Sequence, residues 1–124
     1  MNKIVALVVT YNRKQLLKEN IEALLNQNNN EFDILIVDNA STDGTEELVK
    51  SFENNRIIYE NTGANLGGAG GFNYGVKMSI EKGYDYCWLM DDDTIPKTDS
   101  LEKLIENAKK LNDEFSYPNS PTIL

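Results

Sequence analysis

The sequence contains no histidine and only one cysteine. Without histidine, the side chain that most often serves as a general base near neutral pH is missing. The single cysteine, Cys87, cannot form a disulfide within the chain, and its position inside an apolar run predicts a buried thiol. Any chemistry must therefore use carboxylates, metal ions, backbone amides, tyrosine, lysine or arginine.

Long apolar runs and positive charge are also scarce. No apolar run approaches the roughly 18 residues of a membrane span, and the short one at the start leads directly into the polar TYNR, which is unlike a secretory leader. Lys and Arg number 12 against 20 Asp and Glu, giving a net charge of -8. Such an acidic chain argues against nucleic acid as a partner. We expect a cytoplasmic protein in a reducing compartment.

Apolar segments with strand and helix spacing alternate along the 124 residues. The runs IVALVV and FDILIV are typical of strands that are buried on both faces of a parallel sheet. This alternation predicts one α/β domain with a mainly parallel sheet flanked by helices. We predict strands at residues 4–9, 32–37, 57–59 and 86–90, and helices at residues 15–25, 45–52, 72–82 and 100–111.

A polar cluster follows each predicted strand. TYNR follows the first strand, DNAS the second, a glycine-rich loop at residues 61–71 the third, and DDD the fourth. The carboxyl ends of parallel strands share one edge of the sheet, and ligands of open α/β sheets bind at that edge. We therefore expect all four clusters to meet at one site.

Three adjacent aspartates end the fourth predicted strand. Two carboxylates about 4 Å apart repel by about 1 kcal/mol in water, and by more at lower dielectric. One interpretation is a solvated turn. The other is a divalent cation, because Mg²⁺ and Mn²⁺ prefer oxygen ligands and complete their shell with water and diphosphate. Side chains alternate along an extended segment, which predicts that Asp91 and Asp93 face one way and Asp92 the other.

The other polar residues near the strand ends each have two interpretations. Asp38 either caps the next turn or accepts hydrogen bonds from a nucleotide, and Arg13 either pairs with a carboxylate or binds phosphate. Tyr11 either packs or stacks on a base. Asn65 bonds either a ligand or its own loop. The loop glycines serve conformation alone or allow a ligand to approach the backbone, and they match neither a P-loop nor a dinucleotide fingerprint.

Four motifs together resemble one family. VVTYNR, VDNASTDGT, NLGGAGGFNYG and WLMDDDTIP, in this order, resemble the family 2 glycosyltransferases of the GT-A fold, and most closely the galactofuranosyltransferase and rhamnosyltransferase branch. The resemblance covers residues 3–111. It implies transfer of a sugar from a UDP or dTDP donor to a glycan or lipid-linked acceptor, with inversion and with Mn²⁺ or Mg²⁺. Such acceptors imply that the cytoplasmic protein works at the inner face of the plasma membrane.

The resemblance also assigns roles to individual positions. The metal ligands it implies are Asp93 first and then Asp91. The nucleotide- and donor-binding residues it implies are Thr10, Tyr11, Arg13, Asp38, Asn39, Asn65, Gly67, Gly68, Asp91 and Asp92.

One departure from the family concerns the general base. By resemblance, Asp91 to Asp93 match the family's D-x-D motif. In the family the general base is an acid well beyond that motif, and the chain ends at residue 124, too soon after Asp93. We expect residues 1–111 to be the donor-binding part of a truncated GT-A domain, residues 112–124 to be an irregular tail, and the chain alone to be weakly active or inactive. An exposed sheet edge would then favour a homodimer.

Two other classes of protein remain as alternatives. The first is a nucleotide-sugar-binding module without catalysis. The second is a different α/β enzyme: a nucleotidyltransferase would need a glycine-rich signature after the first strand, and a receiver domain would need an acidic pair there. TYNRKQ supplies neither.

Overall fold

A computed structural model describes residues 3–112 and 121–124 as a parallel sheet between two layers of helices. The strands run in the order β3-β2-β1-β4-β5, and every pair of neighbours is parallel. The predicted α/β architecture is confirmed. In chain order the elements are β1 (Ile4–Thr10), α1 (Lys14–Leu25), β2 (Asp33–Asp38), α2 (Thr45–Ser51), β3 (Ile57–Asn61), α3 (Gly67–Glu81), β4 (Tyr86–Asp91), α4 (Ser100–Asn112) and β5 (Thr122–Ile123).

β1 lies at the centre of the sheet and is buried along its whole length. Its alternate residues point to two separate cores. Val8 belongs to the core that also contains residues of α1, α2 and α4, whereas Leu7 belongs to the core under α3. A strand that is covered on both faces needs apolar residues at every position, which explains the unbroken run IVALVV.

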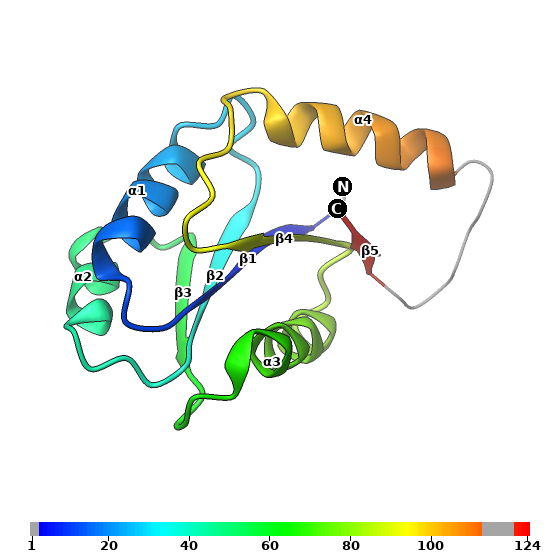
Figure 1. Ribbon diagram of the computed structural model, residues 1–124. Helices are drawn as coiled ribbons and strands as arrows, with labels where there is room; N and C mark the ends of the chain where they lie inside the picture. Colours follow the sequence, from blue (N-terminus) through cyan, green and yellow to red (C-terminus); the bar gives the residue numbers. More distant parts are fainter. Residues whose placement is uncertain (1–2, 113–120) are drawn as a thin grey trace.

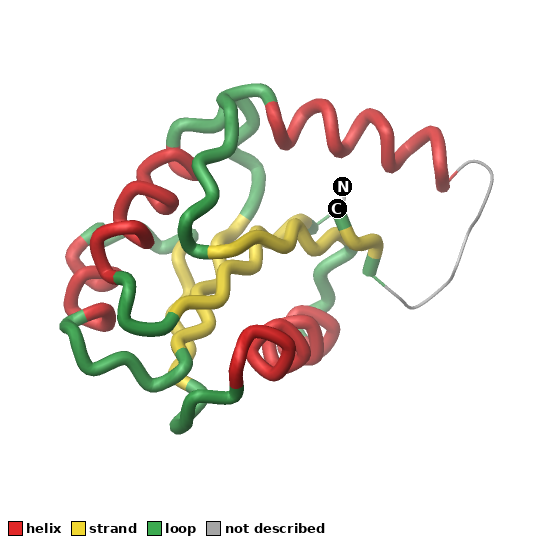
Figure 2. Tube along the Cα trace, in the orientation of Figure 1, coloured by secondary structure: helices red, strands yellow, loops and turns green. Residues whose placement is uncertain are grey.

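The helices divide unevenly between the two faces of the sheet. Helices α1, α2 and α4 cover one face and α3 covers the other, as Figures 1 and 2 show. On α1 the buried residues Leu17, Ile21 and Leu24 form the stripe that predicted this helix. In the described part of the chain, no helix is both long and apolar enough to cross a membrane.

The start of α3 differs from the prediction. Residues 61–71 were expected to be a loop, but α3 begins at Gly67, so the second half of the glycine segment is helical. The reason is packing against β1: a Cβ atom at Gly71 would collide with Val9, and one at Gly75 would collide with Leu7. These two glycines let the helix lie close to the sheet. Gly63, with φ 83°, and Gly67, with φ 74°, are positions of this segment where glycine serves a left-handed backbone.

The end of the chain also differs from the prediction. Thr122 and Ile123, which fall in the tail expected to be irregular, form β5 beside β4. Backbone hydrogen bonds from Thr122 N to Asp85 O and from Leu124 N to Cys87 O, each 2.8 Å, hold the pairing. The rest of that predicted tail, from residue 113 to residue 120, lies outside the described residues. The Cys87 thiol is buried, as predicted.

Candidate functional site

The strand order of the sheet reverses at β1. From β1 it proceeds to β2 and β3 on one side, and β4 then pairs with the other side of β1. The loops that follow β1 and β4 lead to helices on one face of the sheet, whereas the loop that follows β3 leads to α3 on the other face, and a crevice opens at the carboxyl ends of the strands where these loops part. A cavity of about 400 Å³ lies there, which we call the switch-point cavity. It is lined by Val9, Thr10, Tyr11, Arg13, Asn39, Asn65, Gly67, Gly68, Phe72, Asp91 and Asp92.

Nine of the eleven predicted site residues line this cavity, so the structure brings together the clusters that follow all four strands. Asp38 and Asp93 are the two that do not line it. Two further lining residues were not predicted. Val9 is the last apolar residue of β1, and Phe72 is half-buried on α3. A sequence prediction that started α3 at Gly67 would have placed Phe72 in the second turn of the helix, close to the glycine-rich segment.

The three aspartates alternate in exposure, but the predicted pairing of directions stays a prediction, because Asp91 lines the cavity together with Asp92. Asp91 and Asp93 are exposed, whereas Asp92 is buried with 4% exposure. Asp92 accepts a hydrogen bond of 2.9 Å from Thr10 Oγ1 and lies 3.4 Å from Arg13 Nη1. Burial raises the pKa of Asp92, although the bond from Thr10 and the charge of Arg13 act in the opposite direction. Asp92 therefore links β4 to β1, and the other two carboxylates remain free of protein partners in the described chain.

These residues fit a cation that is shared with a bound ligand. Across residues 3–112 and 121–124, no group of three or more His, Cys, Asp or Glu side chains could hold a metal by itself. Mg²⁺ and Mn²⁺ are commonly bound by one or two carboxylates, with water and substrate phosphates completing the shell. The exposed pair Asp91 and Asp93 matches that donor set, and Asp91 also lines the switch-point cavity.

Asp38 is buried, with 1% exposure, at the end of β2. Its Oδ1 accepts a hydrogen bond of 2.9 Å from Ser41 N, and its Oδ2 accepts one of 2.6 Å from the Tyr59 hydroxyl. Burial of Tyr59 and its bond to Asp38 raise the pKa of the tyrosine. Of the two interpretations of Asp38, the structure shows the turn cap. Its role towards a nucleotide stays a prediction.

Asn39 and Asn65 fix the start of α3. Asn39, buried with 2% exposure, donates from Nδ2 to Gly67 O at 3.0 Å and accepts from Thr62 Oγ1 at 3.2 Å. Asn65 Oδ1 accepts from Gly67 N at 2.9 Å, so the bond to its own loop is the one observed. Leu66, the N-cap residue, makes no side-chain capping bond. The amino end of a helix carries free N–H groups and attracts anions, and this one borders the cavity.

The loops after β1 and β2 are tied together by Asn12. Its backbone N–H donates to Ser41 Oγ at 2.8 Å, and its side-chain Oδ1 accepts from Thr42 N at 2.7 Å. Asn12 has a φ of 49°, a left-handed conformation that asparagine tolerates better than most residues. The neighbours Tyr11 and Arg13 remain exposed at the mouth of the cavity. Fold and cavity together define an α/β protein with a polar cavity at the carboxyl ends of its strands.

Comparison with known proteins agrees with this class. Residues 5–123 match the model of glycosyl transferase family 2, and the chain belongs to that family. It is 41% identical over 99 residues to the abequosyltransferase RfbV of Salmonella typhimurium, covering 76% of this chain and 29% of RfbV. It is 36% identical over 93 residues to the galactofuranosyltransferase GlfT1 of Mycolicibacterium smegmatis, covering 75% of this chain and 30% of GlfT1. The match thus spans less than a third of either relative.

Solved structures share the fold. S. aureus TarS 1-349 in complex with UDP-GlcNAc superposes with a TM-score of 0.72 at 24% identity, covering 90% of this chain and 31% of that one. The mannosyltransferase PcManGT from Pyrobaculum calidifontis, in complex with GDP-Man and Mn²⁺, superposes with a TM-score of 0.70 at 21% identity, covering 83% and 31%. The GT-A fold expected from the motifs is confirmed.

Proposed function

We propose that this chain is the donor-binding part of a metal-dependent glycosyltransferase. The whole protein would move a sugar from a nucleotide diphosphate, a UDP- or dTDP-sugar, to a glycan or lipid-linked acceptor with inversion. The observation that carries the proposal is the switch-point cavity, where an exposed carboxylate, an exposed guanidinium and the amino end of a helix meet. Family membership supports the reaction class, and the nucleotide-sugar complexes of the two structural neighbours support the ligand.

The diphosphate would lie against the amino end of α3. A Cβ atom at Gly67 or Gly68 would meet nothing within 4 Å, so the backbone there is open to a ligand. Arg13, which also lines the cavity, would add positive charge. Its side chain is 55% exposed and pairs with Asp92 at 3.4 Å. Because the Arg13 side chain is this exposed, its ion pair with Asp92 is weak. Breaking that pair so that Arg13 can bind a phosphate would cost little free energy.

A divalent cation, Mn²⁺ or Mg²⁺, would be held by Asp93 and Asp91 together with the diphosphate oxygens. When bound, it supplies positive charge that stabilises the leaving group. Asp92 takes no part in that shell, because it is buried against Thr10. Its role is to hold the aspartate turn onto the end of β1.

The base of the nucleotide would lie between the aromatic residues at the mouth of the cavity. Tyr11 is 43% exposed and is available for stacking, and Phe72 forms an apolar wall from α3. Asp38 would support this region through its hydrogen bonds to Ser41 N and to the Tyr59 hydroxyl.

No residue of this chain is assigned as the general base. The carboxylates that line the switch-point cavity are Asp91, proposed as a metal ligand, and Asp92, which is buried and hydrogen-bonded. A base that deprotonates the acceptor has to be a separate group. We therefore assign donor binding, and not sugar transfer, to this chain alone. A homodimer through the sheet edge stays a prediction.

Calorimetric titration with UDP, in the presence and absence of Mn²⁺, tests this function. We expect Mn²⁺ to tighten UDP binding by about tenfold or more, which is about 1.4 kcal/mol. Asp91→Ala and Asp93→Ala should abolish the effect of the metal. Asp99→Ala removes a carboxylate that pairs with Lys103 farther along the same segment, and it should leave the effect intact.

Binding that is the same with and without Mn²⁺ in the unaltered chain would contradict metal-dependent donor binding. Titrations with dTDP and GDP under the same conditions identify the preferred base.

A further inference from the structure

One amide side chain reaches both ends of the aspartate turn. Asn20 lies on α1 and is fully buried. Its Nδ2 lies 2.8 Å from Thr94 O, directly after Asp93, and 3.3 Å from Met90 Sδ, directly before Asp91. The turn itself is closed by a bond of 3.1 Å from Thr94 N to Asp91 O.

Asn20 is an unfavourable residue for the middle of a helix that packs on a sheet. The other buried residues of α1 are Leu17, Ile21 and Leu24. Asparagine has a lower helix propensity than leucine. Its Oδ1 is buried and has no hydrogen-bond partner in the described residues, which lowers the stability of the fold. A residue selected for stability alone would be apolar here, so the bond to Thr94 O calls for another explanation.

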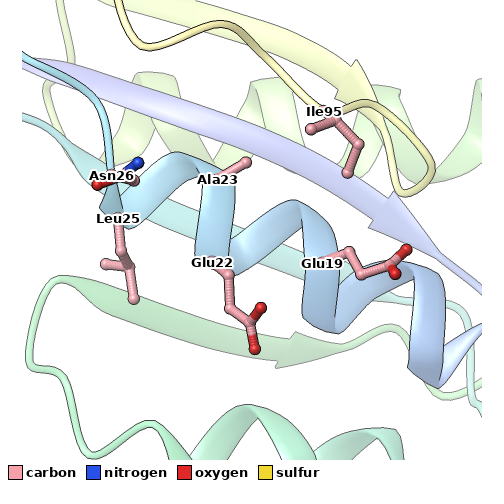
Figure 3. A pocket seen from close by; sticks show the side chains of 6 residues that line it. All are labelled: Glu19, Glu22, Ala23, Leu25, Asn26 and Ile95. Carbon is pink, nitrogen blue, oxygen red and sulfur yellow. The ribbon is translucent and has the colours of Figure 1, made fainter.

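Hydrogen bonds, rather than packing, hold the segment that follows the aspartates. Gln27, two residues beyond the end of α1, donates to Lys97 O at 2.6 Å and accepts from Leu101 N at 3.2 Å. Ile95 lies between the hydrogen bonds at Thr94 and Lys97, and its side chain is 57% exposed. Figure 3 shows it across an open hollow of about 730 Å³ from the residues of α1. Within the described structure, Asn20 therefore supplies the restraint nearest to the aspartates on this side.

We propose that Asn20 is a positioning residue for the metal site. By holding Thr94 O, it keeps Asp91 and Asp93 at the spacing that one cation requires. This inference rests on the proposed function, because it takes these two aspartates as the metal ligands. Without the bond the turn loosens, and cation binding must then order it. Arg13 and the start of α3 make no contact with Asn20 in any described interaction, so binding of the nucleotide without metal is unaffected.

The test compares Asn20→Leu with Gln27→Leu. Both variants remove a buried side-chain amide that donates to a backbone carbonyl, but only Asn20 bonds directly beside the aspartates. Mn²⁺ affinity is measured by electron paramagnetic resonance of the free ion at saturating UDP, and metal-free UDP affinity by calorimetry. We expect Asn20→Leu to weaken Mn²⁺ about tenfold or more and to leave metal-free UDP binding unchanged. Gln27→Leu should keep Mn²⁺ affinity within about twofold.

Equal losses in the two variants, or wild-type Mn²⁺ affinity in Asn20→Leu, would overturn the proposal. Asn20→Ala removes the same donor without adding volume, and it should give the same result if the leucine variant does not fold.

A second readout separates this proposal from the proposed function. Hydrogen exchange of the Thr94 amide, measured without metal or nucleotide, reports on the turn directly. We expect exchange about tenfold faster in Asn20→Ala, with the amides of β1 unchanged. Unchanged exchange at Thr94 would overturn the positioning role. If the unaltered chain takes up no Mn²⁺, the metal part of the proposed function fails, while the exchange result still decides whether Asn20 holds the turn.

Discussion

Gly75→Ala tests how closely α3 lies on β1. Gly75 is buried in the middle of α3. A Cβ atom there would overlap both terminal methyl groups of Leu7 and would lie 3.1 Å from its Cγ. Leu7 is fully buried at the centre of the sheet and cannot turn into solvent. The added methyl group must therefore displace either Leu7 or the helix.

The magnitude follows from two opposing effects. Overpacking a well-packed core costs about 1–3 kcal/mol. Replacing glycine by alanine inside a helix returns up to about 1 kcal/mol. We expect a net loss of about 1–2 kcal/mol, a substantial part of the roughly 5–15 kcal/mol that stabilises a domain. With a urea dependence of about 1–3 kcal/mol per molar, the unfolding midpoint should fall by about 1 M.

Gly68→Ala is the matched control on the same helix. A Cβ atom at Gly68 meets nothing within 4 Å, so the variant should be as stable as the wild type or up to about 1 kcal/mol more stable. Urea unfolding followed by the fluorescence of the buried Trp88 and by circular dichroism measures both variants. If Gly75→Ala proves as stable as Gly68→Ala, α3 does not touch β1 as described, and its amino end is not fixed beside the cavity.

Two carboxylates should respond to pH in opposite ways. Burial raises the pKa of Asp92, so ionisation of Asp92 destabilises the fold as pH rises above the ordinary value of 3.8. Asp92→Asn keeps an acceptor for Thr10. This variant should increase the free energy of unfolding by about 1 kcal/mol at pH 7 and by less near pH 3. Burial also acts to raise the pKa of Asp43, but bonds from Thr45 and Lys14 outweigh it and lower the pKa. Its contribution is present above pH 3.8 and is lost as pH falls through the lowered pKa, so Asp43→Asn should cost about 1 kcal/mol at pH 7. Urea midpoints from pH 3 to pH 8 measure both, and shifts of the same sign at pH 7 would contradict the assigned environments.

The sheet and the edge that carries the site could be predicted from the sequence. Strands β1, β2 and β4 are apolar runs because helices cover both faces of the sheet, and this burial leaves a clear pattern. Parallel strands then bring the polar residues that follow them to one edge without any knowledge of contacts. The extended segment expected for the three aspartates ends at Asp91, and Asp92 and Asp93 form a turn in which only Asp92 is buried.

What the sequence did not reveal depends on contacts between distant residues. The glycine-rich sequence of α3 is typical of a loop. Only the structure shows that Val9 and Leu7 occupy the space that Cβ atoms at Gly71 and Gly75 would need. The partner of Asp38, Tyr59, is set by the register between β2 and β3. Asn20 reads as one polar residue on a helix, and its bond to Thr94 crosses 74 positions of the chain. β5, at two residues, is too short to show any periodicity.

The cation and the nucleotide are proposed to bind together at the switch-point cavity. Paramagnetic broadening of backbone amide signals by substoichiometric Mn²⁺, with UDP present, locates the cation directly. We expect signals around Asp91 and Asp93 to broaden first, followed by those of Thr10 and Gly67, which line the same cavity. Broadening that begins instead at Glu19 and Glu22, the carboxylates of the hollow in Figure 3, would contradict this proposal.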